Sequence, residues 1–424
     1  MDSSRRVVVT GMGVVTPIGQ KVADFWEGMK QAKSGVGTID SFPQNDPHIL
    51  RTCQIKNIGS NVLIAAQVKG FDKHVRLKHF KRDKIILHAD RYSLFAAAAA
   101  DEAVKQSGLE VPFSNPYRAC SIVGSALGGV INLEIGYRHL FELKQTATHP
   151  LQLVRFIGSS AAAHVGIEFG IKGPTFATCS ACSTATHAIE LGRDFIRNGL
   201  VDVALVGASD APHAFGMMRV WQATHLLSPD GIFPFAKKRN GFVLGEGAGI
   251  LVLESVQHAK VRGAKMLAEL CGIGMSSDST DMIHPNVEGA SEAMRLALAD
   301  AQIAPTDIDY VNAHGVATII GDRVETNAIK RVFGKHAYKL AASSTKSMYG
   351  HPLGASGGIE AVACIKAMEE GWMPPTLGLD KADPECDLDY VPNVGRSRKL
   401  TYAMSNALAF TGLNMVLIFG PPPE

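Results

Sequence analysis

The strand-and-helix pattern of the first half of this 424-residue chain starts again near residue 265, and this repetition limits the possible folds more than any other feature. In the first half, short apolar strands followed by glycine turns fall at 6–19, 118–129, 201–209 and 247–254, with a strand and helix at 176–199. In the second half, the corresponding segments are 267–275, 308–315, 340–348 with a helix at 354–369, 399–405 and 414–419. Two similar halves of βαβ units, 1–256 and 257–424, predict stacked layers with the active site at their junction.

The central stretch 176–189 (FATCSACSTATHAI) opens with small residues and continues as a helix. Ala185, Ala188 and Ile189 begin an apolar series at helical spacing, and Gly199 marks its end. Cys182 therefore lies at a strand-to-helix turn. We expect the free N–H groups and the helix dipole there to favour a thiolate nucleophile and to stabilise an oxyanion.

Two other interpretations of this cysteine stay open at this point. Most free cysteines are buried and structural. Cys179 and Cys182 also form a C-x-x-C motif, which occurs in zinc sites and in thioredoxin-like redox pairs. A zinc site needs a second pair of ligands at finger-like spacing, which this sequence does not offer, and redox motifs usually belong to much shorter domains.

Composition limits the function classes. The 42 basic and 40 acidic residues nearly balance, so the global charge gives no indication of nucleic acid or membrane binding. Seven scattered cysteines argue against a disulfide framework and for a reducing compartment. The N-terminal segment lacks the apolar core of a signal peptide, and the apolar run 96–100 is too short to span a bilayer. We expect a cytoplasmic protein.

Further reactive side chains follow strands of the second half: His314, Lys346 and His351. Each one alone is more often structural than catalytic. Open α/β folds gather their sites at strand ends, so these residues and Cys182 are expected to meet.

At this point the chain resembles the β-ketoacyl-[acyl carrier protein] synthases, condensing enzymes of the thiolase superfamily, and most closely their type II branch. The resemblance covers nearly the whole chain. It rests on the motifs VVVTGMGVVTP (7–17), SACS (180–183), DVALVGA (202–208), GFVLGEGAG (241–249), NAHG (312–315), SSTKSMYGH (343–351) and SN (405–406). It implies an α/β thiolase-like fold with α-β-α-β-α layers.

The resemblance also implies roles. Cys182 would attack an acyl thioester and carry the acyl chain, and the amides of Cys182 and Phe410 would form the oxyanion hole. Neutral His314 and His351 would stabilise the enolate formed when a malonyl thioester loses CO2. Lys346 would hold the charge of the site, with Glu325 as its counter-charge.

The implied substrate is bound to an acyl carrier protein, whose phosphopantetheine arm replaces any cofactor of the enzyme itself. Thr318, Val316, Leu127 and Ile283 would contact the substrate. Some relatives hold a structural cation near positions that match Asn312, Glu360, Ser405 and Asn414, but we expect no metal site. The basic residues expected to dock the carrier protein are Lys73, Arg76, Lys78, Lys81, Arg82 and Lys84. The alternative for such a run is a solvated surface. The implied assembly is a homodimer, or a heterodimer with a related ketosynthase-like chain.

Several positions depart from the family pattern. His-Gly-Thr-Ser-Thr-Pro is usual where this chain has HGVATI (314–319), so Val316 removes a hydroxyl, as Ile283 does nearby. Ala409, Thr411 and Leu413 replace glycines around Phe410, which should restrict that loop. These changes favour a specialised acyl or polyketide pathway. The alternatives are a non-catalytic chain-length partner subunit and a coenzyme A thiolase; the latter typically has a second cysteine in the last loop, and residues 405–414 contain none.

Overall fold

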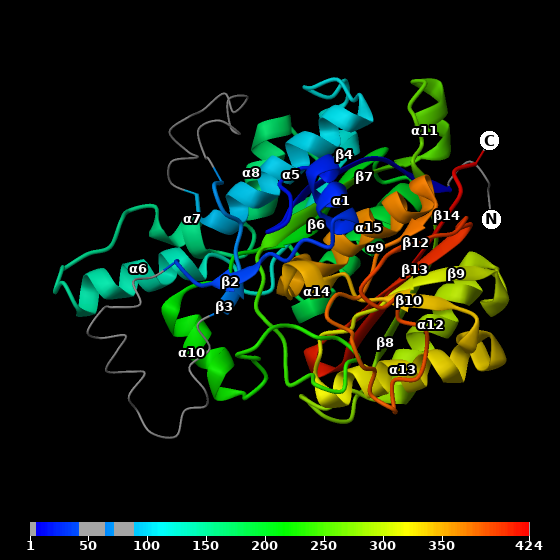
Figure 1. Cartoon of the computed structure of the whole chain (residues 1–424). Helices are drawn as coiled ribbons and strands as arrows, with labels where there is room; N and C mark the ends of the chain where they lie inside the picture. The colour runs from blue at the N-terminus through cyan, green and yellow to red at the C-terminus, as the bar shows by residue number, and fades with distance from the viewer. Residues whose placement is uncertain (1–5, 42–63, 72–88, 424) are drawn as a thin grey trace.

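The computed structural model describes residues 6–41, 64–71 and 89–423. Figure 1 shows it as a ribbon. Its strands are β1 (Val7–Val15), β2 (Val36–Thr38), β3 (Ile64–Ala66), β4 (Ala119–Gly124), β5 (Thr175–Phe176), β6 (Val203–Asp210), β7 (Gly247–Ser255), β8 (Ala268–Ser277), β9 (Ile308–Asn312), β10 (Ala341–Ser343), β11 (Trp372–Met373), β12 (Arg396–Ser397), β13 (Tyr402–Leu408) and β14 (Leu413–Gly420). Its α-helices are α1 (Val22–Lys30), α5 (Arg91–Ser107), α6 (Val130–Phe141), α7 (Gln152–Phe156), α8 (Ser160–Phe169), α9 (Thr184–Arg197), α10 (Phe215–Ala223), α11 (Val256–Val261), α12 (Val287–Ala301), α13 (Ile319–Phe333), α14 (Lys346–Tyr349) and α15 (Ser356–Glu370).

The main sheet has the strand order β10-β9-β13-β14-β8-β1-β7-β6-β4-β5, which places the strands of each half side by side. In the first half β4 runs parallel to β5 and β6, while β7 is antiparallel to β6 and β1. In the second half β9 runs parallel to β10 and β13, while β14 is antiparallel to β13 and β8. The two halves therefore repeat one topology, as the sequence predicts. A short β1–β8 pairing, Val8 opposite Glu269, joins them.

Alternating side chains of the strands define the layers. On β6, Val203 and Leu205 pack in the cluster with α5 and α8, whereas Ala204 and Val206 face the central cluster that contains α9 and α15. On β14, Val416 and Ile418 pack with α12 and α13, while Met415, Leu417 and Phe419 face the same central cluster. The order is thus α-β-α-β-α, with α9 and α15 in the middle layer (Figure 1).

The Gly-x-Gly segments of both halves have a packing role. Within 6–19 the sequence predicted a strand followed by a glycine turn, but β1 continues through Gly11 and Gly13. A Cβ on Gly13 would lie 1.9 Å from the carbonyl oxygen of Ala99 on α5. In β8, a Cβ on Gly274 would lie 1.9 Å from the carbonyl oxygen of Ala293 on α12. These glycines allow the outer helix of each half to lie directly on its strand.

The alanine-rich helix α5 begins at Arg91 and extends to Ser107. Asp90 begins it by accepting the N–H of Tyr92, and Gly108 ends it in a left-handed conformation with φ 67°. The strand expected at 399–405 is β13, which begins only at Tyr402.

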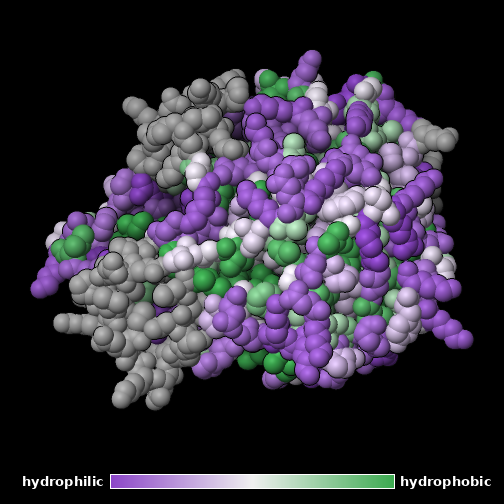
Figure 2. Space-filling model, in the orientation of Figure 1, coloured by the Kyte–Doolittle hydropathy of each residue, from purple (hydrophilic) through white to green (hydrophobic). Residues whose placement is uncertain are grey.

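The division into halves at residue 256 remains a prediction, since α11 follows β7 directly there and the central apolar cluster has members from both halves. On the face shown in Figure 2, hydrophilic side chains cover most of the described surface, with hydrophobic ones gathered mainly near the centre. No helix among the described residues is long and apolar enough to cross a membrane.

Candidate active site

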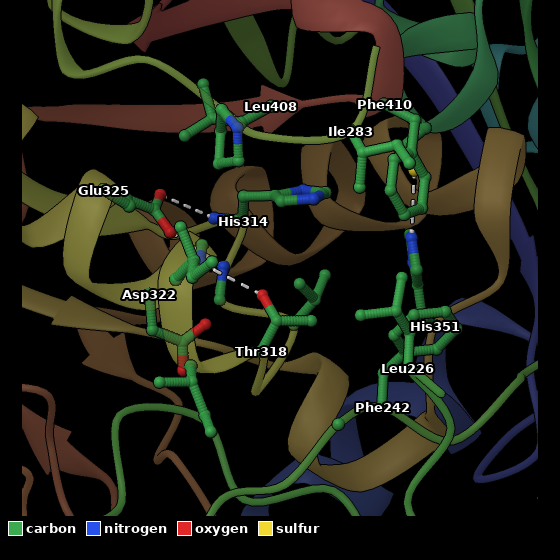
Figure 3. A pocket seen from close by; sticks show the side chains of 18 of the residues that line it. Leu226, Phe242, Ile283, His314, Thr318, Asp322, Glu325, His351, Leu408 and Phe410 are labelled. Atoms are coloured by element: carbon green, nitrogen blue, oxygen red, sulfur yellow. Dashed lines mark hydrogen bonds between the residues drawn. The ribbon is translucent and has the colours of Figure 1, made fainter. Parts of the chain in front are cut away.

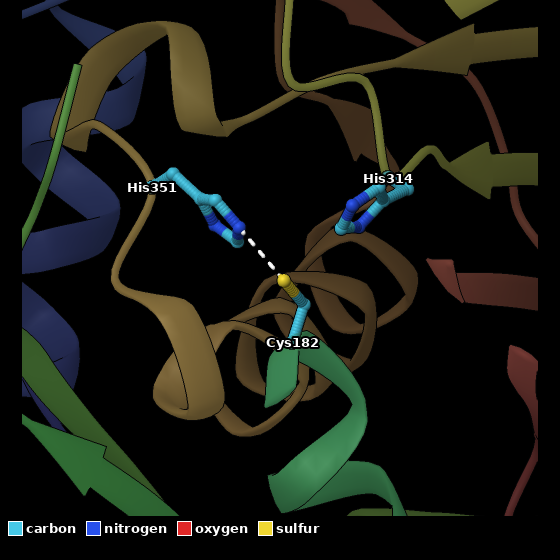
Figure 4. A group of neighbouring side chains, drawn as sticks. All are labelled: Cys182, His314 and His351. Atoms are coloured by element: carbon cyan, nitrogen blue, oxygen red, sulfur yellow. Dashed lines mark hydrogen bonds between the residues drawn. The ribbon is translucent and has the colours of Figure 1, made fainter. Parts of the chain in front are cut away.

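Cys182 lies in a short 3-10 turn, Ala181–Ser183, immediately before α9. Ala181 has a left-handed backbone with φ 49°, which turns the chain sharply from the preceding segment into the helix. Only 3% of Cys182 is exposed. Its Sγ lies 3.1 Å from Nε2 of His351 (Figure 4). The turn expected from the sequence is present, and it directs the thiol toward the second half of the chain.

His314 and His351 approach the thiol from two loops of the second half (Figure 4). Their ring centroids are 5.6 Å apart and the ring planes are nearly perpendicular, at 87°. The ligand atoms of both rings and of Cys182 lie within 4.8 Å of one another. The three side chains that the sequence predicted to meet do so.

The backbone of each histidine is held by buried hydrogen bonds. The amides of His314 and Gly315 each donate to Glu325 at 2.8 Å, and Asn406 Nδ2 donates to the same carboxylate at 3.0 Å. The His351 amide donates to the Val243 carbonyl at 2.8 Å. His351 Nδ1 lies 3.1 Å from Ser356 Oγ, so the ring is fixed at both nitrogens.

Lys346 is fully buried, but its counter-charge differs from the one expected. Its Nζ forms an ion pair with Glu360 on α15 and donates to the His314 carbonyl at 2.8 Å. Glu325, the predicted partner, instead accepts the two backbone amides of the His314 loop. The prediction of a Lys346–Glu325 pair is therefore wrong. The reason is that α15 passes beside Lys346, whereas α13 presents Glu325 to the backbone.

The sequence assigned Glu360 only to a possible cation site. Glu360 is the fifth residue of α15 and lies nine residues after the SSTKSMYGH motif, and this position was the one sequence signal for a pairing with Lys346. Asn414, another of those positions, donates to Asp278 at 2.7 Å.

The pKa of Cys182 shifts in the direction opposite to our expectation. Burial raises it to about 11, and this outweighs the lowering by Lys346 and by the backbone of Phe410. The helix start therefore does not by itself yield a thiolate, because the loss of hydration of the charged sulfur dominates. Burial, together with the charge of Lys346, also lowers the pKa values of His314 and His351 well below the usual range. Both histidines are neutral at physiological pH.

Phe410 begins the loop that closes over the site. Its backbone contacts the Cys182 thiol, and its ring lies 5.9 Å from that of Trp221. Of the non-glycine residues in this loop, Ala409 and Leu413 are extended, but Thr411 has a left-handed backbone with φ 68°. The expected restriction of the loop therefore concentrates at Thr411. Its amide donates to the Met282 carbonyl at 3.0 Å.

A cavity of about 260 Å³ leads to Cys182 and both histidines (Figure 3). Val316, Thr318 and Ile283, which we expect to contact the substrate, line this cavity. The Thr318 side chain also accepts the Gly321 amide at 3.2 Å and so begins α13. Leu127 does not line this cavity; it packs in a neighbouring apolar cluster with Leu353. The six basic residues predicted for docking, between Lys73 and Lys84, lie outside the described residues.

The model of the β-ketoacyl synthase N-terminal domain matches residues 4–259, and that of the C-terminal domain matches residues 267–380. The chain belongs to the β-ketoacyl synthase family. It is 42% identical to nodulation protein E of Rhizobium sp. (strain N33) over 415 residues, which cover 98% of this chain and 99% of that protein. It is 38% identical to 3-oxoacyl-[acyl-carrier-protein] synthase 2 of Staphylococcus aureus (strain COL) over 428 residues, which cover 99% of each chain.

Solved ketosynthases share the fold. The ishigamide ketosynthase/chain length factor structure matches with a TM-score of 0.90 and 32% identity, over 99% of this chain and all of that one. A β-ketoacyl synthase from Burkholderia phymatum STM815 matches with a TM-score of 0.88 and 32% identity, with the same coverage. The predicted family, thiolase-like fold and condensing-enzyme class are confirmed. Enzymes of this family use no cofactor of their own.

The family assignment also bears on the C-x-x-C motif. Cys179 and Cys182 are not bonded to each other; Cys179 is exposed and its Sγ lies 3.7 Å from the Ala126 carbonyl oxygen. The two cysteines therefore have different surroundings. Cys182 is buried and contacts His351, whereas Cys179 is exposed.

Proposed function

We propose that Cys182 is the nucleophile of a decarboxylative Claisen condensation, in which it carries the acyl chain while His314 and His351 act on a malonyl thioester. The observation that carries this proposal is the 3.1 Å contact between Cys182 Sγ and His351 Nε2 inside a cavity that His314 also lines. The fold brings these groups together from segments more than 100 residues apart.

In the first step, Sγ bonds to the carbonyl carbon of an acyl thioester. Because burial raises the pKa of Cys182, the thiol proton must leave as the bond forms. His351 Nε2 is within reach to accept this proton and pass it to the departing pantetheine sulfur. The backbone amides of Cys182 and Phe410 stabilise the negative charge that develops on the carbonyl oxygen.

In the second step, a malonyl thioester enters and its C–C bond to the carboxylate breaks, releasing CO2 and leaving an enolate. Neutral histidines are suited to donate hydrogen bonds to the enolate oxygen. For this donation His351 carries its proton on Nε2, the atom that faces the site, and the Ser356 hydroxyl donates to Nδ1. The acylation step uses the other neutral tautomer, in which Nδ1 carries the proton and donates to Ser356 Oγ, so the ring changes tautomer between the two steps. The enolate carbon then attacks the acyl-enzyme carbonyl, Sγ leaves, and a β-ketoacyl thioester forms.

The proposed partner is an acyl carrier protein, whose phosphopantetheine arm would reach through the cavity. A type II polyketide ketosynthase that is similar to this chain, with a TM-score of 0.86 and 31% identity, has been solved in complex with its acyl-carrier protein. The basic residues between Lys73 and Lys84 would attract this acidic partner, an effect that weakens with salt. We place the reaction in the cytoplasm.

The apolar lining favours a specialised acyl or polyketide chain over housekeeping fatty-acid synthesis. Val316 and Ile283 both line the cavity and both lack the hydroxyls usual in the family. The intact set of Cys182, His314, Lys346 and His351 supports a catalytic role for this chain rather than that of a chain-length subunit. Its partner in a dimer is then a second copy or a related ketosynthase-like chain, the latter as in the ishigamide ketosynthase/chain length factor structure.

The test is mass spectrometry of the enzyme after incubation with a series of acyl carrier protein thioesters. In the His314→Ala variant, we expect the acyl group to accumulate on Cys182, and its mass gives the chain preferred by the enzyme. Acylation of Cys179 instead, or of neither cysteine with any acyl thioester, would contradict the proposal.

A further inference from the structure

The loop after β4 and the turn that follows His351 both donate hydrogen bonds to one buried carboxylate, that of Asp210 at the end of β6. Asp210 is completely buried. Its Oδ1 accepts the Ser125 hydroxyl at 2.6 Å and the Leu127 amide at 3.3 Å. The donors on this side all come from the first half of the chain.

The other oxygen connects the two halves. Asp210 Oδ2 accepts the Ala126 amide at 3.1 Å and the Gly354 amide at 2.8 Å. Gly354 follows His351 by three residues, in the 3-10 turn Leu353–Ala355. A Cβ on Gly354 would lie 2.7 Å from Asp210 Oδ2, so this close approach requires a residue without a side chain.

We infer that Asp210 is a positioning residue whose carboxylate fixes the turn after His351 and thereby holds His351 Nε2 at hydrogen-bonding distance from Cys182 Sγ. The inference rests on the proposed roles of Cys182 and His351. The β4 loop that shares the carboxylate also contacts the nucleophile segment, because the Ala126 carbonyl faces Cys179 Sγ. One group therefore aligns the loops on both sides of the thiol.

The charge of Asp210 argues against a different role, the activation of the cysteine. Burial raises the pKa of Asp210 to about 6, while its four donors oppose that shift. Its charge raises the pKa values of the groups that face it, Cys182 and Cys179 beside the site and Tyr92 on α5. A carboxylate that disfavours the thiolate does not activate it. Because Asp210 accepts four hydrogen bonds from the loops beside the site, we assign it a positioning role.

The decisive variant is Asp210→Asn, which keeps the shape of the side chain but has only one acceptor oxygen for these donors. Misplacement of His351 by a fraction of an ångström should lower the kcat of condensation by roughly 10²-fold, with KM for the malonyl substrate little changed. Although condensation slows, alkylation of Cys182 by iodoacetamide should become easier in this variant. The midpoint pH of alkylation should fall, because the variant removes a negative charge beside the thiol.

The pH profile of kcat gives a further readout. Below about pH 6 the wild-type carboxylate takes up a proton and loses acceptor capacity, so its kcat should fall there. Asp210→Asn should lack this acid limb. The matched control is Asp300→Asn. Asp300 is a half-buried carboxylate that accepts hydrogen bonds from Arg193 and from the Ile273 amide, but it contacts none of the loops at the site. This control should keep both the wild-type kcat and the acid limb.

The His351→Ala background tests whether Asp210 acts through His351. In that background, Asp210→Asn should slow the residual reaction less than twofold, since the group that it positions is gone. An equal loss in both backgrounds would overturn the inference. An unchanged midpoint pH for the alkylation of Cys182 would also overturn the inference. Alkylation needs no acyl substrate, so this measurement remains valid even if the proposed condensation fails. A wild type that forms no acyl-enzyme contradicts the proposed function instead.

Discussion

The two halves use the same turn for different purposes. In the first half, the 3-10 turn Ala181–Ser183 leads into α9, and in the second half the turn Leu353–Ala355 leads into α15. Both turns begin with a left-handed residue, Ala181 with φ 49° and Leu353 with φ 47°. The next residue is Cys182 in the first half and Gly354 in the second.

This difference shows how a repeated fold builds an asymmetric site. In the first half the turn presents a side chain, the thiol of Cys182, to the cavity. In the second half the same position has no side chain, and its amide donates to Asp210 instead. The turn of the second half thereby supports His351, which lies three residues before Gly354 in the sequence.

A second parallel concerns the loops after β4 and β9. Each is held by a fully buried carboxylate that accepts backbone amides, Asp210 for the first loop and Glu325 for the second. Burial raises the pKa of both. The loop after β9 carries His314, whereas the loop after β4 carries no titratable group. The proposed catalytic side chains other than Cys182, namely His314, Lys346 and His351, thus belong to the second half.

The largest effect is expected from the nucleophile itself. Cys182→Ala should lower condensation by at least about 10³-fold, because no other group of the turn can form the acyl-enzyme. Cys179→Ala should retain activity within about twofold, since this side chain is exposed and does not contact a histidine. Steady-state turnover with matched substrates measures both. Equal losses in the two variants would revive the redox or metal interpretation of the motif.

Among these variants, the largest change in the free energy of unfolding is expected at the buried ion pair of the second half, Lys346 with Glu360. Lys346→Met leaves Glu360 buried without its partner and should lower the free energy of unfolding by about 3–5 kcal/mol. Urea denaturation measures this change. The double variant Lys346→Met with Glu360→Leu should recover part of the loss, because neither charge then remains buried. Failure of the double variant to recover stability would mean that the pair is not the source of the effect.

The two histidines should separate by reaction step. Only His351 contacts the thiol, so His351→Ala should slow acyl-enzyme formation by roughly 10²-fold, the range of a lost acid–base group. His314→Ala should leave acylation nearly intact and stop malonyl decarboxylation. Rapid-quench mass spectrometry measures the first step and CO2 release the second. If both variants acylate at the wild-type rate, the thiol proton leaves by another route.

The smallest effect concerns the strained turn beside the nucleophile. Ala181→Gly removes the steric cost of a left-handed Cβ, about 1–2 kcal/mol, against a comparable gain in unfolded-chain entropy. The free energy of unfolding should therefore change by less than about 1 kcal/mol. Ala188→Gly, inside α9, is the control and should be destabilising by about 1 kcal/mol or more. A loss at Ala181 as large as that at Ala188 would show that its left-handed conformation carries no strain.

The sequence alone determined the features that depend on local pattern. The repeated strands and glycines identified two related halves, and the turn at Cys182 followed from a strand-like segment that meets a helical period. The motifs around His314 and His351 were sufficient to predict that these two side chains meet the thiol in one cavity. The motif around Lys346 likewise predicted that this residue lies beside them, where it donates to the His314 carbonyl. Each strand, turn and motif can be recognised from neighbouring residues alone, without knowledge of how the segments pack.

Only the tertiary structure decided the features that depend on burial and on contacts between distant segments. The partner of Lys346 is Glu360 rather than Glu325, because the packing of α15 determines which carboxylate reaches the ammonium group. The pKa of Cys182 is raised rather than lowered, because desolvation depends on every atom around the sulfur, whereas the helix dipole can be inferred from one segment. The role of Asp210 was likewise not visible in the sequence, since its donors lie about 84 residues before it and 144 residues after it.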